Sequence, residues 1–184
     1  MKLDQATIIE AGLALLDEAG LDGFTLRALA ARLSVQAPAL YWHVGGGKAE
    51  LLSLMAMTFY ARGHAATEGA AEWRGWLSLY GRALRKALLA HRDSAQLCAI
   101  ATPMETGSAA AAARLAAPLV RLGLSDRDAL SYQGSVIAFT LGWALYQQSR
   151  TMHDYLTAMF DFDESYEIGL TALVGGFPPQ AARR

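Results

Sequence analysis

The stretch QAPALYWHV, residues 36–44, carries an unusual mixture of side chains for a short helix. Gln36 offers an amide, and Tyr41, Trp42 and His43 follow one another, each with an O–H or N–H donor. Neighbouring helix positions point in different directions, so these three side chains cannot all enter one core. The stretch therefore predicts a polar contact surface. Its amide suits a base edge, and its aromatic donors suit phosphate oxygens.

The flanking residues indicate which helices hold this surface. Asp4 is a good N-cap for a first helix, and Thr25 caps a second. A tight break at 34–35 separates the second helix from a third, which has Pro38 in its first turn, where a missing N–H is harmless. Three glycines at 45–47 end the third helix. Two short helices joined by a tight turn and braced by a longer one are typical of the helix-turn-helix.

Signals for the starts and ends of helices continue through the rest of the chain. We expect helices at about 48–64 and 73–91, one or two within 94–123, a long one from 125 to about 150, a short amphipathic piece at 155–160, and a last helix with Tyr166, Leu170, Leu173, Val174 and Phe177 on one face. No run alternates convincingly with period two. The predicted fold is all-α.

The composition of the chain indicates what kind of protein it is and where it resides. The chain has 184 residues, of which 53% are hydrophobic and 18% charged, so a substantial core is expected. The single cysteine, Cys98, cannot form an internal disulfide and favours a reducing cytosol. The first residues lack a signal-peptide pattern. Residues 129–149 are uncharged but include polar serines and glutamines, so a helix buried in a bundle is favoured over a membrane span. We expect a cytoplasmic protein.

Helical geometry gives the third helix two sides. Leu40 and Val44 are four residues apart and can anchor it, which leaves the donors on the opposite arc. In a major groove, Gln36 can pair with a base edge, and Pro38 and its alanine neighbours can pack on thymine methyl groups. The alternative is that Tyr41 and its neighbours merely cap the core of a helical bundle.

The segment TLRALAARLSVQAPALYWHVGGGKAELL, residues 25–52, resembles the DNA-binding domain of the TetR family of bacterial transcriptional repressors. Residues 73–93 and 129–148 are similar to the regulatory domain of that family. The resemblance implies a helix-turn-helix domain at 1–47, a ligand-binding and dimerisation domain at 48–177, and a flexible tail at 178–184. It also implies a homodimer that binds a palindromic operator and releases it when a small molecule binds.

Carried over by position, the resemblance implies a set of DNA-contacting residues: Thr25, Arg27, Gln36, Ala37, Pro38, Ala39, Tyr41, Trp42, His43 and Lys48. The alanines replace polar positions known in the family, so the operator sequence should differ. Residues 1–50 hold four Lys or Arg against six Asp or Glu, a net charge of −2. Few phosphates can be neutralised by one headpiece, so a monomer should bind DNA poorly.

The effector positions implied by the resemblance are largely apolar and aromatic: His64, Tyr80, Leu84, Cys98, Met104, Phe139, Trp143 and Tyr146. They suit a mid-sized, largely hydrophobic effector, although the same side chains could instead fill the space themselves. Cys98 and Tyr146 stand where metal-dependent members of the family have a histidine and its acidic partner. No carboxylate remains for magnesium, so neither a metal nor another cofactor is expected. His64, at the end of the 48–64 helix, is the expected trigger.

Other functions remain open at this point. A TetR-like regulator could lack an effector or act as an activator. An all-α enzyme is disfavoured, because we find no carboxylate pair, metal-ligand spacing or nucleophile–base arrangement. GGGK is not a phosphate loop, since Trp42 stands at the first glycine position and Ala49 replaces the required Ser or Thr. An interaction module with a vestigial headpiece is the third class.

Overall fold

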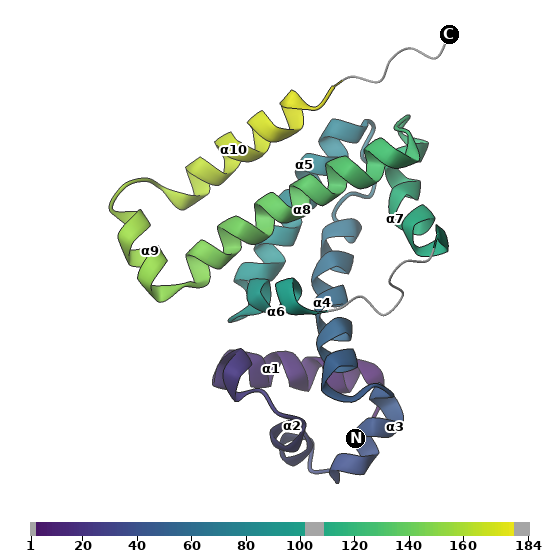
Figure 1. Cartoon of the computed structure of the whole chain (residues 1–184), viewed down its shortest axis with the longest axis vertical. Coiled ribbons are helices and arrows are strands. Elements are labelled where there is room, and N and C mark those ends of the chain that lie inside the picture. The colour runs from purple at the N-terminus through teal and green to yellow at the C-terminus, as the bar shows by residue number, and fades with distance from the viewer. Residues whose placement is uncertain (1–2, 102–108, 179–184) are drawn as a thin grey trace.

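The computed structural model describes residues 3–101 and 109–178, and within these ranges the chain is helical with no strand (Figure 1). The helices are α1 (Gln5–Gly23), α2 (Leu26–Arg32), α3 (Ala37–Val44), α4 (Gly47–Ala65), α5 (Trp73–Leu89), α6 (Ser94–Ile100), α7 (Ala109–Arg121), α8 (Asp126–Gln148), α9 (Arg150–Thr157) and α10 (Phe162–Gly176). The all-α prediction is confirmed. Helices α1–α3 gather at one end, α5–α10 form a larger bundle at the other, and α4 runs between them.

The predicted caps begin their helices as expected. Asp4 and Thr25 each accept a hydrogen bond from the backbone N–H three residues further on, at 2.8 and 3.1 Å. Ser125 does the same at the start of α8, at 3.1 Å. Each cap satisfies a backbone donor that has no partner inside its helix. Glu72, whose carboxylate caps α5, was not foreseen.

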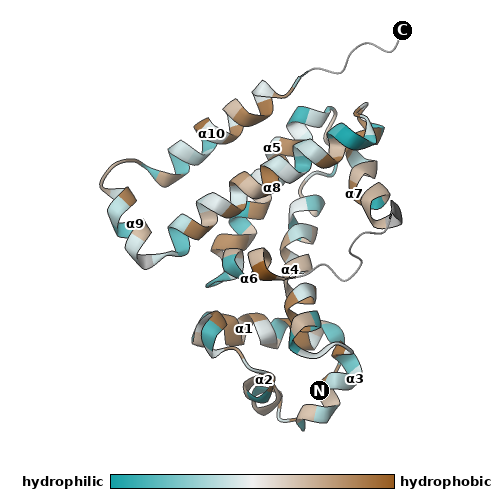
Figure 2. Cartoon of the chain, viewed as in Figure 1, coloured by the Kyte–Doolittle hydropathy of each residue, from teal (hydrophilic) through white to brown (hydrophobic). Residues whose placement is uncertain are grey.

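The N-terminal helices share a small apolar core. Leu16, Leu29 and Leu40 are almost completely buried, and so is Met55 from the first half of α4. In Figure 2 the ribbons of these helices carry apolar positions, in brown, beside hydrophilic ones, in teal. At the α3–α4 turn, Gly47 has φ +70°, a backbone conformation that costs glycine least. The glycine run therefore ends α3 and allows α4 to begin after two intervening residues.

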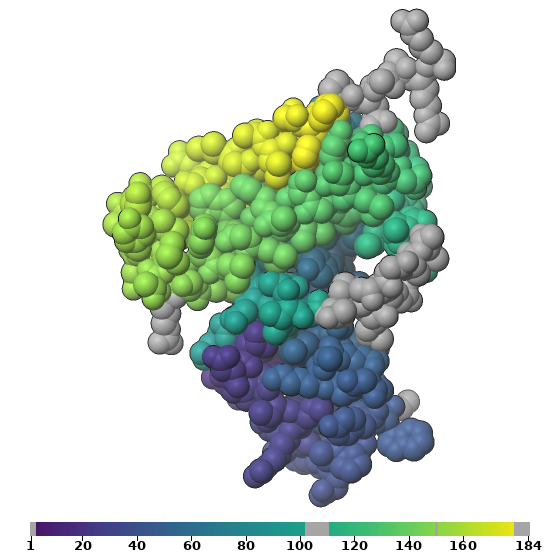
Figure 3. All heavy atoms as spheres, viewed as in Figure 1, coloured from purple at the N-terminus to yellow at the C-terminus, as the bar shows by residue number. Residues whose placement is uncertain are grey.

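The larger bundle is built around α8, which packs against α5, α6, α7, α9 and α10. Its buried face carries Val136 and Thr140, and the Thr140 hydroxyl lies 2.9 Å from the Tyr166 hydroxyl of α10. Figure 3 shows α10, in yellow, lying along α8, in green, with α9, in yellow-green, at one end of α8, while α6, in teal, lies between the larger bundle and the N-terminal helices.

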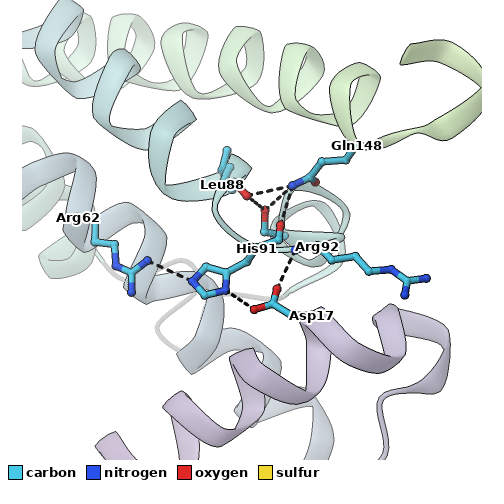
Figure 4. A network of polar contacts seen from close by, with 7 residues as sticks. Asp17, Arg62, Leu88, His91, Arg92 and Gln148 are labelled. Atoms are coloured by element: carbon cyan, nitrogen blue, oxygen red, sulfur yellow. Dashed lines mark hydrogen bonds and ion pairs between the residues drawn. The ribbon is translucent and has the colours of Figure 1, made fainter. Parts of the chain in front are cut away.

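A polar network joins the two ends of the molecule (Figure 4). The Asp17 carboxylate of α1 accepts from His91 Nδ1 and from the Arg92 backbone N–H, both at 2.9 Å. From the other side, the side-chain amide of Gln148 donates to the carbonyls of Leu88 and His91 at 2.9 and 2.7 Å. The α5–α6 connection is thus held by α1 on one side and by the last residue of α8 on the other.

A kink in α1 adds a further contact between α1 and the α5–α6 connection, and we call this region the junction. Gly20 has φ +70°, which interrupts the helix, and the N–H of Leu21 donates to the Asp93 carboxylate at 2.9 Å. A Cβ at position 20 would lie 2.8 Å from side-chain atoms of Arg92 and Asp93. Glycine is therefore needed here for both its conformation and its size.

Within the described residues, no helix combines the length and apolar character needed to cross a bilayer. The predicted flexible tail lies outside the described residues from position 179 onward.

Candidate nucleic-acid interface and effector site

The third helix separates its buried and exposed side chains by geometry. Leu40 and Val44, one turn apart, are each 1% exposed and hold α3 against α1 and α4. Between them, Trp42 is 91% exposed and Tyr41 50% exposed, and His43 is exposed as well. Three adjacent aromatic donors therefore lie outside the core, as the sequence pattern predicted.

The start of α3 adds a second group of accessible side chains. Gln36 is the exposed N-cap residue, and within the described part of the chain its amide makes no capping bond. Pro38 is exposed in the first turn, while the flanking Ala37 and Ala39 are half-buried. This end of the helix presents one free amide among small apolar groups.

The remaining predicted DNA contacts come from neighbouring helices. Thr25 is exposed, but its hydroxyl already caps α2. Arg27 is exposed as the second residue of α2. Lys48 donates from Nζ to the carbonyl of Phe24 at 2.7 Å, so its ammonium is tied to the end of α1. A phosphate at Lys48 would have to share or replace that bond.

The predicted effector residues separate into two groups. His64, Tyr80 and Cys98 come together where α4, α5, α6 and α8 meet. The His64 ring lies 5.0 Å from the Tyr80 ring and 5.4 Å from the Trp76 ring. Trp76 stacks on Tyr80, with ring centroids 5.1 Å apart and planes 9° apart. Leu84, one turn beyond Tyr80, is completely buried.

The second group lies on another side of α8. The Phe139 ring is 5.3 Å from Tyr166 of α10, and Trp143 packs 5.6 Å from Phe160, after α9. Tyr146 is 49% exposed. These residues share a stripe of α8 that faces α9, α10 and solvent, so the structure does not bring them to His64. Met104 lies outside the described residues.

Two polar members of the His64 cluster were missed from the sequence. Gln133 of α8 is 3% exposed, and its Nε2 lies 3.2 Å from His64 Nε2. Tyr60, one turn before His64 on α4, interacts through its hydroxyl with the Cys98 thiol. One-turn spacing to His64 was the available signal for Tyr60, and a lone glutamine in an apolar run was the signal for Gln133.

Burial controls the protonation of this cluster. Desolvation lowers the pKa of His64 below its usual 6.5 and raises the pKa of Tyr60 and Tyr80 above 10. It also raises the pKa of Cys98 to about 12, although the bond from Tyr60 acts in the opposite direction. At neutral pH all four groups are uncharged, and the thiol is a poor nucleophile and a poor metal ligand.

A cavity of about 570 Å³ borders the cluster between the end of α4, the start of α5 and the end of α7. It is lined by His64, Ala65, Thr67, Glu68, Gly69, Ala70, Trp76, Pro118, Arg121 and Leu122. Among the described side chains, no three His, Cys, Asp or Glu residues converge as metal ligands. Magnesium requires oxygen ligands in octahedral array, and neither the protonated thiol of Cys98 nor the exposed Tyr146 supplies them. The residues present do not fit a magnesium site.

Comparison with known proteins gives the same assignment in both halves of the chain. Residues 8–55 match the family described as bacterial regulatory proteins, tetR family, and residues 65–159 match the tetracyclin repressor-like C-terminal domain. Tetracycline repressor protein class A from transposon 1721 of Escherichia coli is 40% identical over 150 residues, which cover 80% of this chain and 68% of that protein.

Two solved structures are similar over almost the whole chain. A variant of TetR from Acinetobacter baumannii AYE, in complex with minocycline, is 35% identical with a TM-score of 0.76, covering 96% of this chain and 97% of that one. BioQ with its natural double-stranded DNA operator is 31% identical with a TM-score of 0.69, covering 95% and 98%.

The helix-turn-helix headpiece, joined through one long helix to an all-α bundle, defines a class of DNA-binding transcriptional regulators. The chain belongs to the TetR family of bacterial regulatory proteins.

Proposed function

We propose that this protein is a cytoplasmic, homodimeric repressor that binds a palindromic operator and is released by a small, largely hydrophobic effector. Residues 1–47 would read the DNA, and residues 48–177 would bind the effector and dimerise. The observation that carries the proposal is the outer surface of α3. A tryptophan that is 91% exposed beside two further donors, on a helix anchored by buried residues, is suited to a partner surface.

In this proposal α3 lies in the major groove. Gln36 reads a base edge, and Ala37, Pro38 and Ala39 pack on thymine methyl groups. Tyr41, Trp42 and His43 donate to phosphate oxygens on either side, while Thr25, Arg27 and Lys48 hold the backbone at the edge of the groove. BioQ, which resembles this chain over its length, has been solved with its operator DNA and supports this docking.

A twofold dimer would place two such helices about one DNA turn apart, roughly 34–36 Å. The support for dimerisation is a stripe of small residues on α8, one turn apart: Gly134, the exposed Ala138, and Gly142. A Cβ at either glycine would meet no described atom within 4 Å. On α10, Ile168 is 63% exposed. Small residues beside an exposed apolar one suit close packing against a second copy.

Effector binding would act through α4, the helix that runs between the two ends of the molecule. His64 lies in the last turn of α4, against the Trp76–Tyr80 stack. A Cβ at Gly63 would lie 2.8 Å from the Tyr80 ring, so α4 already packs tightly at this point. A molecule inserted here must displace α4, which would change the separation of the headpieces and oppose DNA binding through one coupling free energy.

The experiment compares two substitutions in α3 by gel shift on the DNA upstream of the protein's own gene. Trp42→Ala should weaken binding about tenfold or more, because a DNA contact is lost, and leave the free energy of unfolding nearly unchanged. Leu40→Ala should instead lower the free energy of unfolding by about 2–4 kcal/mol, because a buried leucine leaves a cavity. Wild-type affinity in Trp42→Ala would place the DNA surface elsewhere.

A further inference from the structure

Two buried polar atoms in the His64 cluster lack partners. Within the residues that the structure describes, neither the Tyr80 hydroxyl nor Gln133 Oε1 has a hydrogen-bond partner. Tyr80 is completely buried and Gln133 is 3% exposed, so bulk water does not solvate them. Buried polar groups are nearly always paired in folded proteins, because an unpaired one loses its hydration without compensation. Two such atoms on facing helices indicate a site that a ligand completes.

The Gln133 amide cannot satisfy itself by rotating. Its Nε2 lies 3.2 Å from His64 Nε2 and donates to the neutral ring. If the amide were turned over, the oxygen would accept from His64 and the NH₂ group would lose its partner. One end of the amide remains unpaired in either orientation. The same side chain lies beside the Tyr80 hydroxyl and interacts with it enough to offset part of the rise in the pKa of Tyr80, but among the described residues neither the Tyr80 hydroxyl nor Gln133 Oε1 reaches hydrogen-bonding geometry with a partner.

The surroundings of the two atoms restrict the ligand. Trp76 and Tyr80 form a stacked aromatic wall, and the cavity that opens beside it is lined by His64 and Trp76. Burial raises the pKa of Tyr60 and of Cys98, and the two groups interact with each other, so they offer no charge at neutral pH. Glu68 and Arg121 line the same cavity, but both are exposed and of opposite sign. Among the side chains that the structure describes, none carries a charge that would compensate a charged ligand at the two unpaired atoms.

We propose that the effector of this protein is an uncharged, planar aromatic compound that carries a hydroxyl group and binds without a metal. The hydroxyl accepts a hydrogen bond from Tyr80 and donates one to Gln133 Oε1. A hydroxyl is a single group that does both, whereas a carboxylate only accepts and an ammonium only donates. The ring system lies along the Trp76–Tyr80 wall, and the molecule enters from the adjacent cavity. This inference rests on the proposed effector-responsive function.

Three probes of similar size test the inference: 2-naphthol, naphthalene and 2-naphthoate, with binding measured by equilibrium dialysis. The wild-type protein should bind 2-naphthol about tenfold more tightly than the other two, since one net hydrogen bond of the usual strength corresponds to about that ratio. Tyr80→Phe and Gln133→Leu each remove one of the two hydrogen bonds, so each should reduce the preference for 2-naphthol over naphthalene to about threefold and leave naphthalene binding unchanged. Equal binding of 2-naphthol and naphthalene, or no binding of 2-naphthol, overturns the proposal.

Thermal melting of the ligand-free protein tests the premise independently. Tyr80→Phe removes an unpaired buried hydroxyl and should raise the melting temperature. Tyr60→Phe is the matched control, because the Tyr60 hydroxyl interacts with the Cys98 thiol, and it should lower the melting temperature and retain the preference for 2-naphthol. If Tyr80→Phe lowers the melting temperature as much as Tyr60→Phe does, the hydroxyl is satisfied inside the protein and the proposal is wrong. A gel shift on the same samples separates this outcome from failure of the proposed function, in which no operator fragment is bound.

Discussion

Among single side chains, His64 has the clearest dependence on its surroundings. Its ring packs edge-on against two aromatic rings and accepts a hydrogen bond from a buried amide. Both features favour the neutral ring, and desolvation lowers its pKa in the folded protein. As the pH falls, the unfolded chain therefore takes up a proton at this histidine before the folded chain does. The proton stabilises the unfolded state, so acid weakens the fold.

This gives a prediction for stability against pH. The free energy of unfolding should be independent of His64 well above pH 6.5 and should decrease as the pH falls below 6.5, until the folded-state pKa is reached. Urea titrations between about pH 8 and 5 measure the effect. His64→Asn should show a flatter profile, because the titrating group is gone. Parallel profiles for the wild type and the variant would show that His64 is not desolvated.

The residues of α3 and those of the buried cluster differ in how far they were predictable. Leu40 and Val44 could be placed inside and Trp42 outside, because one turn of helix decides all three. Gln133 and Tyr60 could not be placed, since a polar residue in an apolar helix can face either a partner or solvent. Only the convergence of α4, α5 and α8 decides that Gln133 meets His64.

At the scale of elements, the starts of helices were predictable because capping is local. The orientation of α8 was not, because this helix is apolar on more than one side. The resemblance placed Phe139, Trp143 and Tyr146 in one pocket with His64. In the structure, α10 and the residues after α9 pack on the stripe that holds Phe139 and Trp143, while Gln133 and Val136 face inward. The choice between these faces depends on helices distant in the sequence.

The kink in α1 gives a prediction with a matched control. Gly20→Ala and Gly69→Ala both place a Cβ at positive φ, +70° and +82°, where an L side chain is strained. Only the Cβ at position 20 meets neighbours, at 2.8 Å from Arg92 and Asp93, whereas the described atoms leave the space at position 69 open. Chemical denaturation should therefore show a larger loss for Gly20→Ala. Equal losses would mean that the junction has room for a methyl group.

For the whole molecule, the proposed dimer predicts which surface substitution changes its mass in solution. Ala138→Arg places a charge on the α8 stripe and should convert a dimer into a monomer in light scattering, because an unpaired charge at an interface is costly. Ala113→Arg makes the same change at an exposed position of α7 and should leave the mass unchanged. Operator affinity should fall with the first variant alone. If the Ala138→Arg protein were still a dimer, this face of α8 would not be the dimer interface.

Gln148 is the last residue of α8, and its side-chain amide donates hydrogen bonds to the connection between α5 and α6. That connection in turn contacts α1. If the last turn of α8 unfolded, the hydrogen bonds of Gln148 would be lost. The headpiece could then change its orientation relative to the larger bundle, although every group that faces DNA or the cavity stayed in place. Genetic screens for loss of repression should accordingly recover substitutions of Gln148, far from either binding surface, in proteins that remain folded but no longer hold the operator.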